Sequence, residues 1–298
     1  MTILNVSEIV KNYGAVRALK GVSFSVPEGA VYGVLGPNGS GKTTLLSILL
    51  NVLSADKGSY EWFGQSADHT QRSQIGSLLE TPNFYPYLSA VNNLRITQSI
   101  SGRGDEDQID QVLQKVNLHI WKKKPFSSYS LGMKQRLAIA AALLGEPRVL
   151  ILDEPTNGLD PVGIAEIRAL IQELSRKGHT VIMASHLLDE VEKVCTHVAI
   201  LKSGELVVSG PVHDVLVQED VVELGAADII HLKQAASGIA GAHEIVVSEH
   251  YVQLYFPKGK ASLEDINRHC FQQGVVLNHL LMKRKRLEEK FFELTKQS

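Results

Sequence analysis

Three short, mostly apolar runs without polar alternation are the clearest pattern in this chain of 298 residues. They cover residues 31–35, 149–152 and 180–185. A run that is apolar on both faces is typical of a central strand in a parallel sheet that helices cover on both sides. The chain is therefore predicted to fold around an α/β core.

Helix-like patterns fill the region between the first two of these runs. Residues 81–145 are predicted to be mostly helical, with helical segments at 91–95, 109–116 and, rich in Ala and Leu, 133–144. This insert is expected to form a helical subdomain. Its aromatic stretch, residues 84–87, either faces outward to meet a partner or folds back on the subdomain core, and the sequence leaves both open.

Shorter strands complete the predicted first domain, residues 1–215. They are expected at 3–10, 21–26 and 60–63. A hairpin is expected from 198–202 to 205–208, because Ser203-Gly204 lies between two strand-like runs.

Residues 216–298 are predicted to form a small α+β domain, for which the sequence suggests no ligand. Strands are expected at 228–232, 244–247, 251–256 and 275–281, and helices at 262–273 and 287–296. Ser262 is the expected N-cap of the first helix, with Asp265 three residues later. The basic run 283–286 fits a solvated turn better than a site for anionic lipid.

Chemistry enters at the loop that follows the first apolar run. Residues 36–43 match G-x-x-x-x-G-K-[ST] between a predicted strand and a predicted helix, which is the setting of a phosphate-binding loop. Glycines there let backbone N–H groups surround a polyphosphate at the start of a helix. Lys42 is expected to reach the β- and γ-phosphates, and the Thr43 hydroxyl to hold Mg²⁺. The predicted nucleotide-binding residues are Gly36, Pro37, Asn38, Gly39, Ser40, Gly41, Lys42, Thr43 and Thr44.

Two acidic residues end the second apolar run. Parallel strands gather ligands at their carboxyl ends, where Asp153 and Glu154 fall. Asp153 is predicted to bind Mg²⁺ through its water shell, because this ion keeps most of its waters in proteins. Glu154 is predicted to orient or deprotonate an attacking water, a general-base role.

Four segments then occur in the order typical of ATP-binding cassette (ABC) ATPases: 36–43, 130–135, 150–160 and His186. Over residues 1–215 the chain resembles this family. The resemblance implies a cassette with a P-loop core, a β-subdomain and a helical subdomain, which hydrolyses ATP with Mg²⁺.

The resemblance also implies further site residues. Ser130 and Gly132 match the signature segment that contacts the γ-phosphate of ATP on the opposite subunit, although Ser130 equally suits an N-cap. His186 resembles the switch histidine of the catalytic site. Asp160 resembles the loop that couples two ATP sites, or caps the helix that starts at Pro161. Tyr13 matches the aromatic residue that stacks on adenine.

Departures from the family pattern narrow the resemblance. Glu80 stands where most ABC ATPases place a metal-reaching Gln, and an ionised carboxylate can accept hydrogen bonds but not donate them. The signature segment is Tyr-Ser-Leu-Gly-Met rather than Leu-Ser-Gly-Gly-Gln. These features, with the ending of the chain (287–295), resemble the branch that exports peptide antibiotics such as bacitracin and lantibiotics.

Composition agrees with a peripheral subunit. The net charge of −2 and 21% charged residues give no basic excess for nucleic acid. No window approaches a spanning helix, and the N-terminus lacks a secretory pattern. Cys195 and Cys270 fit no metal or redox spacing, so both are expected to be reduced and inert.

One phosphate loop and one signature segment per chain imply, in this family, a head-to-tail homodimer with two ATP at its interface. The expected partner is a separate integral-membrane permease, which places the chain at the cytoplasmic face of the membrane. The alternative is a soluble ABC ATPase acting on ribosomes or DNA, although the double cassettes, coiled coils and zinc cysteines of those classes are missing from the sequence. Import rather than export also stays open.

Overall fold

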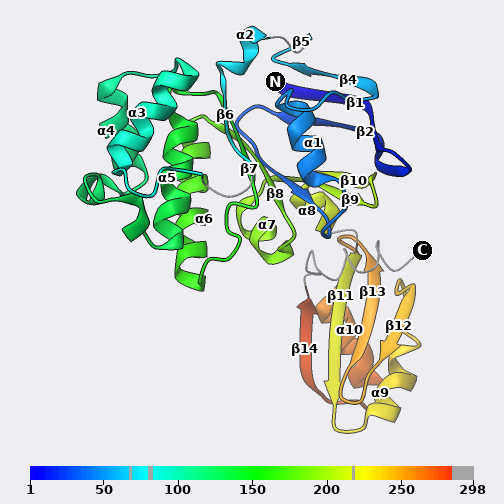
Figure 1. Cartoon of the computed structure of the whole chain (residues 1–298). Helices are drawn as coiled ribbons and strands as arrows, with labels where there is room; N and C mark the ends of the chain where they lie inside the picture. The colour runs from blue at the N-terminus through cyan, green and yellow to red at the C-terminus, as the bar shows by residue number, and fades with distance from the viewer. Residues whose placement is uncertain (67–68, 80–82, 217–218, 284–298) are drawn as a thin grey trace. The chain divides into compact units, whose positions relative to one another are not determined.

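The computed structural model of the protein describes residues 1–66, 69–79, 83–216 and 219–283. The chain divides into two compact units, one covering Met1–Pro211 and the other beginning at Val212 (Figure 1). Glu80 and the predicted helix at 287–296 lie outside the described residues.

A six-stranded sheet in the order β10-β9-β3-β8-β7-β6 forms the centre of the first unit. All neighbouring pairs from β9 to β6 are parallel, and only β10 runs antiparallel to its neighbour. Every residue of β3, β7 and β8 is buried, which confirms the three predicted central strands. The strands are β3 (Val31–Leu35), β6 (Ile75–Leu78), β7 (Val149–Asp153), β8 (Thr180–Ser185), β9 (His197–Lys202) and β10 (Glu205–Pro211).

The predicted hairpin joins β9 to β10 through the two-residue turn Ser203-Gly204. Both turn residues have positive φ, 48° and 84°, as expected for the turn type that matches strand twist. The turn approaches the phosphate loop, since the Gly204 N–H donates to the Ser40 carbonyl at 3.1 Å.

A second, antiparallel sheet has the order β2-β1-β4-β5. It shares one buried core with α1 and the central strands. Trp62 is 1% exposed, and its indole N–H donates to the Leu49 carbonyl at 3.1 Å, which ties this sheet to the end of α1. The elements are β1 (Thr2–Tyr13), β2 (Val16–Pro27), α1 (Lys42–Leu49), β4 (Lys57–Trp62) and β5 (Gln65–Ser66). β1 and β2 extend beyond the predicted strands because they continue pairing as far as Tyr13 and Val16.

The helical subdomain lies between β6 and β7, as predicted. Its helices are α3 (Ala90–Ser101), α4 (Glu106–Lys115) and α5 (Leu131–Leu143), with short 3-10 turns at His119–Trp121 and Phe126–Ser128. The remaining helices of the first unit are α2 (His69–Arg72), α6 (Pro161–Arg176) and α7 (Leu188–Val194).

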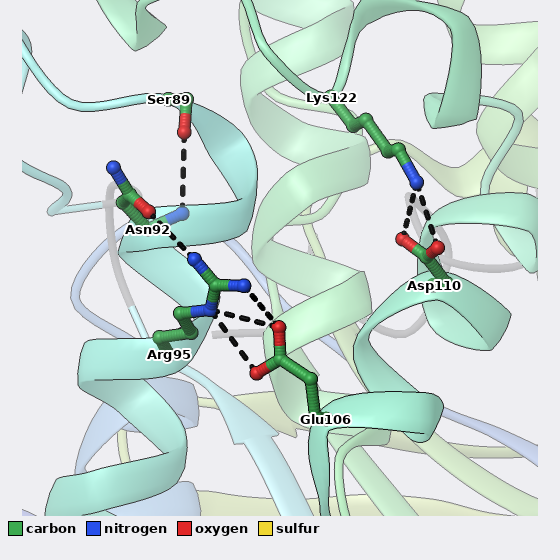
Figure 2. Close-up of polar contacts among 6 residues, drawn as sticks. All are labelled: Ser89, Asn92, Arg95, Glu106, Asp110 and Lys122. Atoms are coloured by element: carbon green, nitrogen blue, oxygen red, sulfur yellow. Dashed lines mark hydrogen bonds and ion pairs between the residues drawn. The ribbon is translucent and has the colours of Figure 1, made fainter.

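Polar contacts link the helices of this subdomain at its surface (Figure 2). The Arg95 guanidinium on α3 donates to both carboxylate oxygens of Glu106 on α4, through Nε at 2.9 and 3.0 Å. Lys122 Nζ reaches both oxygens of Asp110 on α4 at 2.7 and 2.8 Å. Both pairs are exposed, so each contributes at most about 1 kcal/mol to stability.

The aromatic stretch 84–87 partly folds back on the subdomain core and partly faces outward, so each of the two predicted alternatives holds for some of its residues. Phe84 packs edge-on against Phe126 of the subdomain core, with ring centroids 5.3 Å apart. Tyr85 and Tyr87 are 49% and 72% exposed. The stretch therefore anchors itself through one ring and presents two others to the surface.

The second unit is a four-stranded antiparallel sheet in the order β12-β13-β11-β14. From β11 to β14 its elements follow one another as β-α-β-β-α-β, the split βαβ arrangement of ferredoxin-like folds. The elements are α8 (Val212–Leu216), β11 (Glu219–Ala226), α9 (Ile229–Ala236), β12 (Glu244–Val247), β13 (Val252–Pro257), α10 (Leu263–Gln272) and β14 (Leu277–Lys283). Both α9 and α10 contribute to one buried core with the sheet.

Within this unit, one predicted strand is wrong. Residues 228–232 begin helix α9, whose N-cap is Asp228: its side chain accepts from the N–H groups of Ile230 and His231, both at 3.0 Å. Three apolar residues in a short run fit either element, and the capping side chain favours the helix. The predicted N-cap Ser262 is confirmed, since its hydroxyl accepts from the Asp265 N–H at 3.2 Å.

The two cysteines are buried and free, as the sequence suggested. Burial raises the pKa of both thiols, which keeps them protonated and unreactive.

A buried carboxylate, Glu223, is the main polar feature of this sheet. Its side chain is 8% exposed and accepts hydrogen bonds from Gln253 Nε2 at 2.9 Å and His279 Nε2 at 3.1 Å, besides an ion pair with Lys283. Burial opposes ionisation, but these contacts outweigh it and hold the pKa of Glu223 below its usual range.

Glu223→Gln is expected to destabilise the second unit by about 1 kcal/mol at neutral pH, because the amide cannot pair with Lys283. A depressed folded-state pKa stabilises the fold above the carboxyl's ordinary pKa, and this contribution disappears as the pH falls below that range. The variant's unfolding midpoint should therefore approach that of the wild type in acid, when full-length proteins are compared by thermal unfolding at both pH values. A constant difference across the pH range would contradict the charge-based explanation.

Candidate functional site

The carboxyl ends of β3, β7 and β8 bring three distant segments of the chain together. β3 leads into the loop 36–41, and α1 begins at Lys42. Two loop glycines have no room for a side chain: a Cβ on Gly36 would lie 2.3 Å from Ser40 Oγ, and one on Gly41 would lie 2.6 Å from the Ala18 carbonyl. Gly41 also has φ 102°, a left-handed conformation that favours glycine. The loop therefore folds closely on itself and on β2.

Lys42 lies under this loop and is 6% exposed. Its Nζ donates to the carbonyls of Gly36 and Pro37 at 2.8 and 3.3 Å and forms an ion pair with Glu154 Oε1 at 3.5 Å. The phosphate loop and the end of β7 are thus joined by a buried cation.

Thr43 and Asp153 face each other across the same junction. The Thr43 hydroxyl donates to Asp153 Oδ2 at 2.7 Å, and Asp153 is 4% exposed. A hydroxyl beside a carboxylate supplies the hard oxygen donors that Mg²⁺ prefers. These two residues fit the predicted metal site.

Glu154 follows Asp153 in a strained conformation. Its φ is 48°, uncommon for a residue other than glycine, and its N–H donates to the Ala184 carbonyl on β8 at 3.1 Å. Glu154 Oε2 lies 2.8 Å from His186 Nδ1. A strained backbone persists only where the surrounding structure holds it in place, and such residues are concentrated at functional sites.

Tyr13 lies at the end of β1 and is 47% exposed. The two residues before it are held by Asp56, whose carboxylate accepts from the Asn12 N–H at 2.7 Å and from Lys11 Nζ at 3.2 Å. These hydrogen bonds, chiefly the one from the Asn12 backbone, lower the pKa of Asp56. The strand that carries Tyr13 is therefore anchored although its ring is open to solvent.

A cavity of about 740 Å³ connects Tyr13 with the phosphate loop. Its lining includes seven of the predicted nucleotide-binding residues and the predicted base: Tyr13, Asn38, Gly39, Gly41, Lys42, Thr43, Thr44 and Glu154. The cavity is large enough for a nucleotide, since ligand sites usually span ~300–1,000 Å³.

Ser130, Gly132 and Asp160 do not belong to the described lining of this cavity. Ser130 caps α5 by accepting from the Met133 N–H at 3.3 Å, and Asp160 caps α6 by accepting from the Gly163 N–H at 2.7 Å. The two caps are neighbours, because a Cβ on Gly158 would lie 3.2 Å from Leu131 Cδ2. They form a second cluster within the same unit.

Three polar or charged lining residues were not predicted from the sequence: Arg17, Lys20 and Ser203. They belong to β2 and the β9–β10 turn, outside every recognised motif. The sequence could have indicated that the strand after Tyr13 lies near the nucleotide, but it does not show which side chains of that strand face the cavity. Glu80, the third predicted metal residue, lies outside the described residues.

The sequence is similar to known ATP-binding proteins of transporters. Residues 19–157 match the ABC transporter family. The bacitracin transport ATP-binding protein BcrA of Enterococcus faecalis is 34% identical over 98% of this chain and 96% of its own length. The lantibiotic transport ATP-binding protein SrtF of Streptococcus pyogenes is 39% identical over 69% of this chain and 89% of its own length.

Solved structures of ATP-binding cassettes resemble this chain as well. The chain resembles CbiO1 from Clostridium perfringens, part of an ABC transporter complex, with a TM-score of 0.66 and 33% identity over 72% of this chain and 90% of the other. It also resembles a dimeric, post-hydrolysis ATP-binding cassette bound to ADP and Pi, with a TM-score of 0.63 and 25% identity over 70% of this chain and 98% of the other.

Proposed function

The chain belongs to the ATP-binding proteins of ABC transporters, and on this premise we propose that it hydrolyses ATP to power export through a separate membrane permease. One observation carries the proposal: Lys42, Glu154 and His186 form a connected set at the carboxyl ends of β3, β7 and β8, beside a nucleotide-sized cavity.

Lys42 is the residue that holds the phosphates. It lies inside the loop whose backbone N–H groups surround them, and a bound β- or γ-phosphate competes with Glu154 for its ammonium group. Glu154 is then free to accept a proton from the attacking water. His186, hydrogen-bonded to the same carboxylate, orients it and contributes a second polar contact near the γ-phosphate.

Mg²⁺ is the expected cofactor, held by the Thr43 hydroxyl and, through water, by Asp153. Once bound, the ion neutralises phosphate charge. Tyr13 offers an exposed aromatic face for the adenine ring at the other end of the cavity.

A second copy of the chain completes the site in this proposal. The cluster of Ser130, Gly132 and Asp160 does not line the cavity of its own chain, but presents a helix N-terminus, where backbone N–H groups favour anions. Head-to-tail pairing would place this cluster over the γ-phosphate of the partner copy. Loss of that phosphate would then remove the affinity that favours the closed pair.

The transported substrate is proposed to be a peptide antibiotic or another hydrophobic compound. Support comes from relatives whose names specify bacitracin and lantibiotic transport. None of the helices in the described ranges combines the length and apolarity needed to cross a bilayer. We also propose the cytoplasmic face of the membrane as its location, on a permease that is a separate chain.

The helical subdomain offers a surface for that permease. A cavity of about 420 Å³ is lined by the aromatic stretch and α3, including Phe84, Tyr85, Ile96 and Ile100. Ile100 is 83% exposed, and nearby Tyr87 is 72% exposed. Exposed apolar side chains around a hollow are typical of protein interaction sites.

The test is to tag the Glu154→Gln variant, extract it from its native membranes with mild detergent and MgATP, and identify the proteins that copurify. A membrane protein with several spanning helices is the expected partner. Adding Ile100→Asp should reduce its recovery several-fold, whereas Ile120→Asp, at a site 71% exposed outside the hollow, should not. Recovery of ribosomes or DNA-repair proteins instead would overturn the transport proposal.

A further inference from the structure

Arg17 on β2 belongs to the wall of the nucleotide cavity, together with Tyr13, Lys42 and Thr44. No recognised motif includes it. Its side chain is exposed, but the backbone beside it packs closely against Gly41 and Gly204.

Two glycines hold the backbone at this point. A Cβ on Gly41 would lie 2.6 Å from the Ala18 carbonyl, and a Cβ on Gly204 would lie 2.6 Å from that carbonyl and 3.1 Å from the Arg17 carbonyl. The Lys20 N–H also donates to the Gly204 carbonyl at 2.8 Å. The segment that carries Arg17 is therefore fixed between the phosphate loop and the β9–β10 turn.

The pairing of β1 with β2 is irregular at the same place. Lys11 pairs with Leu19, but the next residue, Asn12, pairs with Arg17, so β2 carries one extra residue, Ala18. Such bulges change the direction of neighbouring side chains and are frequent beside active sites. The irregularity explains how an exposed strand residue comes to line the cavity.

The positive charge of Arg17 is not balanced by a described carboxylate, unlike the charges of its neighbours. The other cations around this cavity are paired: Lys42 with Glu154 at 3.5 Å, Lys20 with Glu205 at 3.0 Å, and Lys11, next to Tyr13, with Asp56 at 3.2 Å. Among the residues that the structure describes, the Arg17 side chain has neither a hydrogen bond nor an ion pair.

We propose that the Arg17 guanidinium binds the phosphate chain of the nucleotide, as a second cationic contact beside Lys42. The inference rests on the proposed function, because it requires a nucleotide in this cavity. A guanidinium presents a planar fork of donors that matches two phosphate oxygens, which a lysine at this position could not reproduce.

The experiment is to measure the affinity of the full-length wild type and of Arg17→Ala for MgATP and ADP by calorimetry. Arg17→Ala is expected to bind both nucleotides about 5- to 10-fold more weakly, a moderate effect because the site is open to solvent. Arg17→Lys should fall between the two. Lys177→Ala is the control for the loss of one positive charge, since this lysine forms an exposed pair with Glu173 and does not line the cavity, and the affinity of this variant should stay within about twofold of the wild type.

Ionic strength separates a charge contact from a change of shape. The difference in nucleotide affinity between wild type and Arg17→Ala should shrink at about 1 M salt, where the Debye length is only about 3 Å. Equal affinities of the two proteins at low salt, or a deficit that salt leaves unchanged, would overturn the inference. A wild type that binds no nucleotide at all would instead overturn the proposed function.

Discussion

Replacing Glu154 with Gln is expected to slow ATP hydrolysis by about 10²–10⁴-fold while leaving ATP bound, because a general base contributes a factor of this size. Gln preserves the shape of the side chain and can still contact His186, but it cannot accept the proton of the attacking water. With MgATP the variant should accumulate as a stable dimer. Phosphate release and size-exclusion chromatography with light scattering measure the two effects.

Glu190→Gln is the matched control for this prediction. Glu190 is also a largely buried carboxylate, 8% exposed and paired with Arg168 at 2.6 Å, but its ion pair links α6 to α7 instead of facing the phosphate loop. Its loss should cost stability and spare turnover per folded molecule. Robust hydrolysis by Glu154→Gln would remove Glu154 from the proposed role.

The second large effect is expected at Lys42. Lys42→Ala should weaken ATP binding at least about 100-fold, because it removes charge-assisted contacts to two phosphates, each worth about 1.5–3 kcal/mol. It also leaves Glu154 without its nearest cation. The measurement is nucleotide titration by calorimetry.

Stability must be measured beside it, since Lys42 is buried. Thermal unfolding without nucleotide shows whether the variant is folded, and Lys177→Ala, which breaks an exposed pair with Glu173, controls for the simple loss of one positive charge. A folded Lys42→Ala protein that binds ATP normally would contradict the assignment of this lysine to the phosphates.

The parts of the fold that are encoded locally could be predicted from the sequence. The central strands are continuous apolar runs, and the phosphate loop has a fixed spacing between a strand and a helix, so both are visible without the structure. The strand predicted at residues 228–232 is wrong because three apolar residues in so short a run do not distinguish a strand from a helix. Asp228 identifies the helix because its side chain accepts from the N–H groups of Ile230 and His231, and this geometry cannot be read from the sequence pattern.

The same limit explains the site. Its motif residues are predictable one by one, whereas Arg17 depends on long-range contacts: a bulge in β2, two close-packed glycines 163 positions apart (Gly41 and Gly204), and carboxylates that pair with the other cations and not with this one. None of these relations is periodic or adjacent along the chain. Only the folded arrangement reveals them.

The division of strands between the two units has an evolutionary consequence. Every described strand of the two nucleotide-binding sheets precedes Val212, and every described strand of the ferredoxin-like sheet follows it. A single crossing of the chain joins them, so a recombination event at that crossing could add, delete or replace the C-terminal unit without removing a strand from the ATPase. Lineages can therefore diversify the appendage while ATP chemistry stays the same.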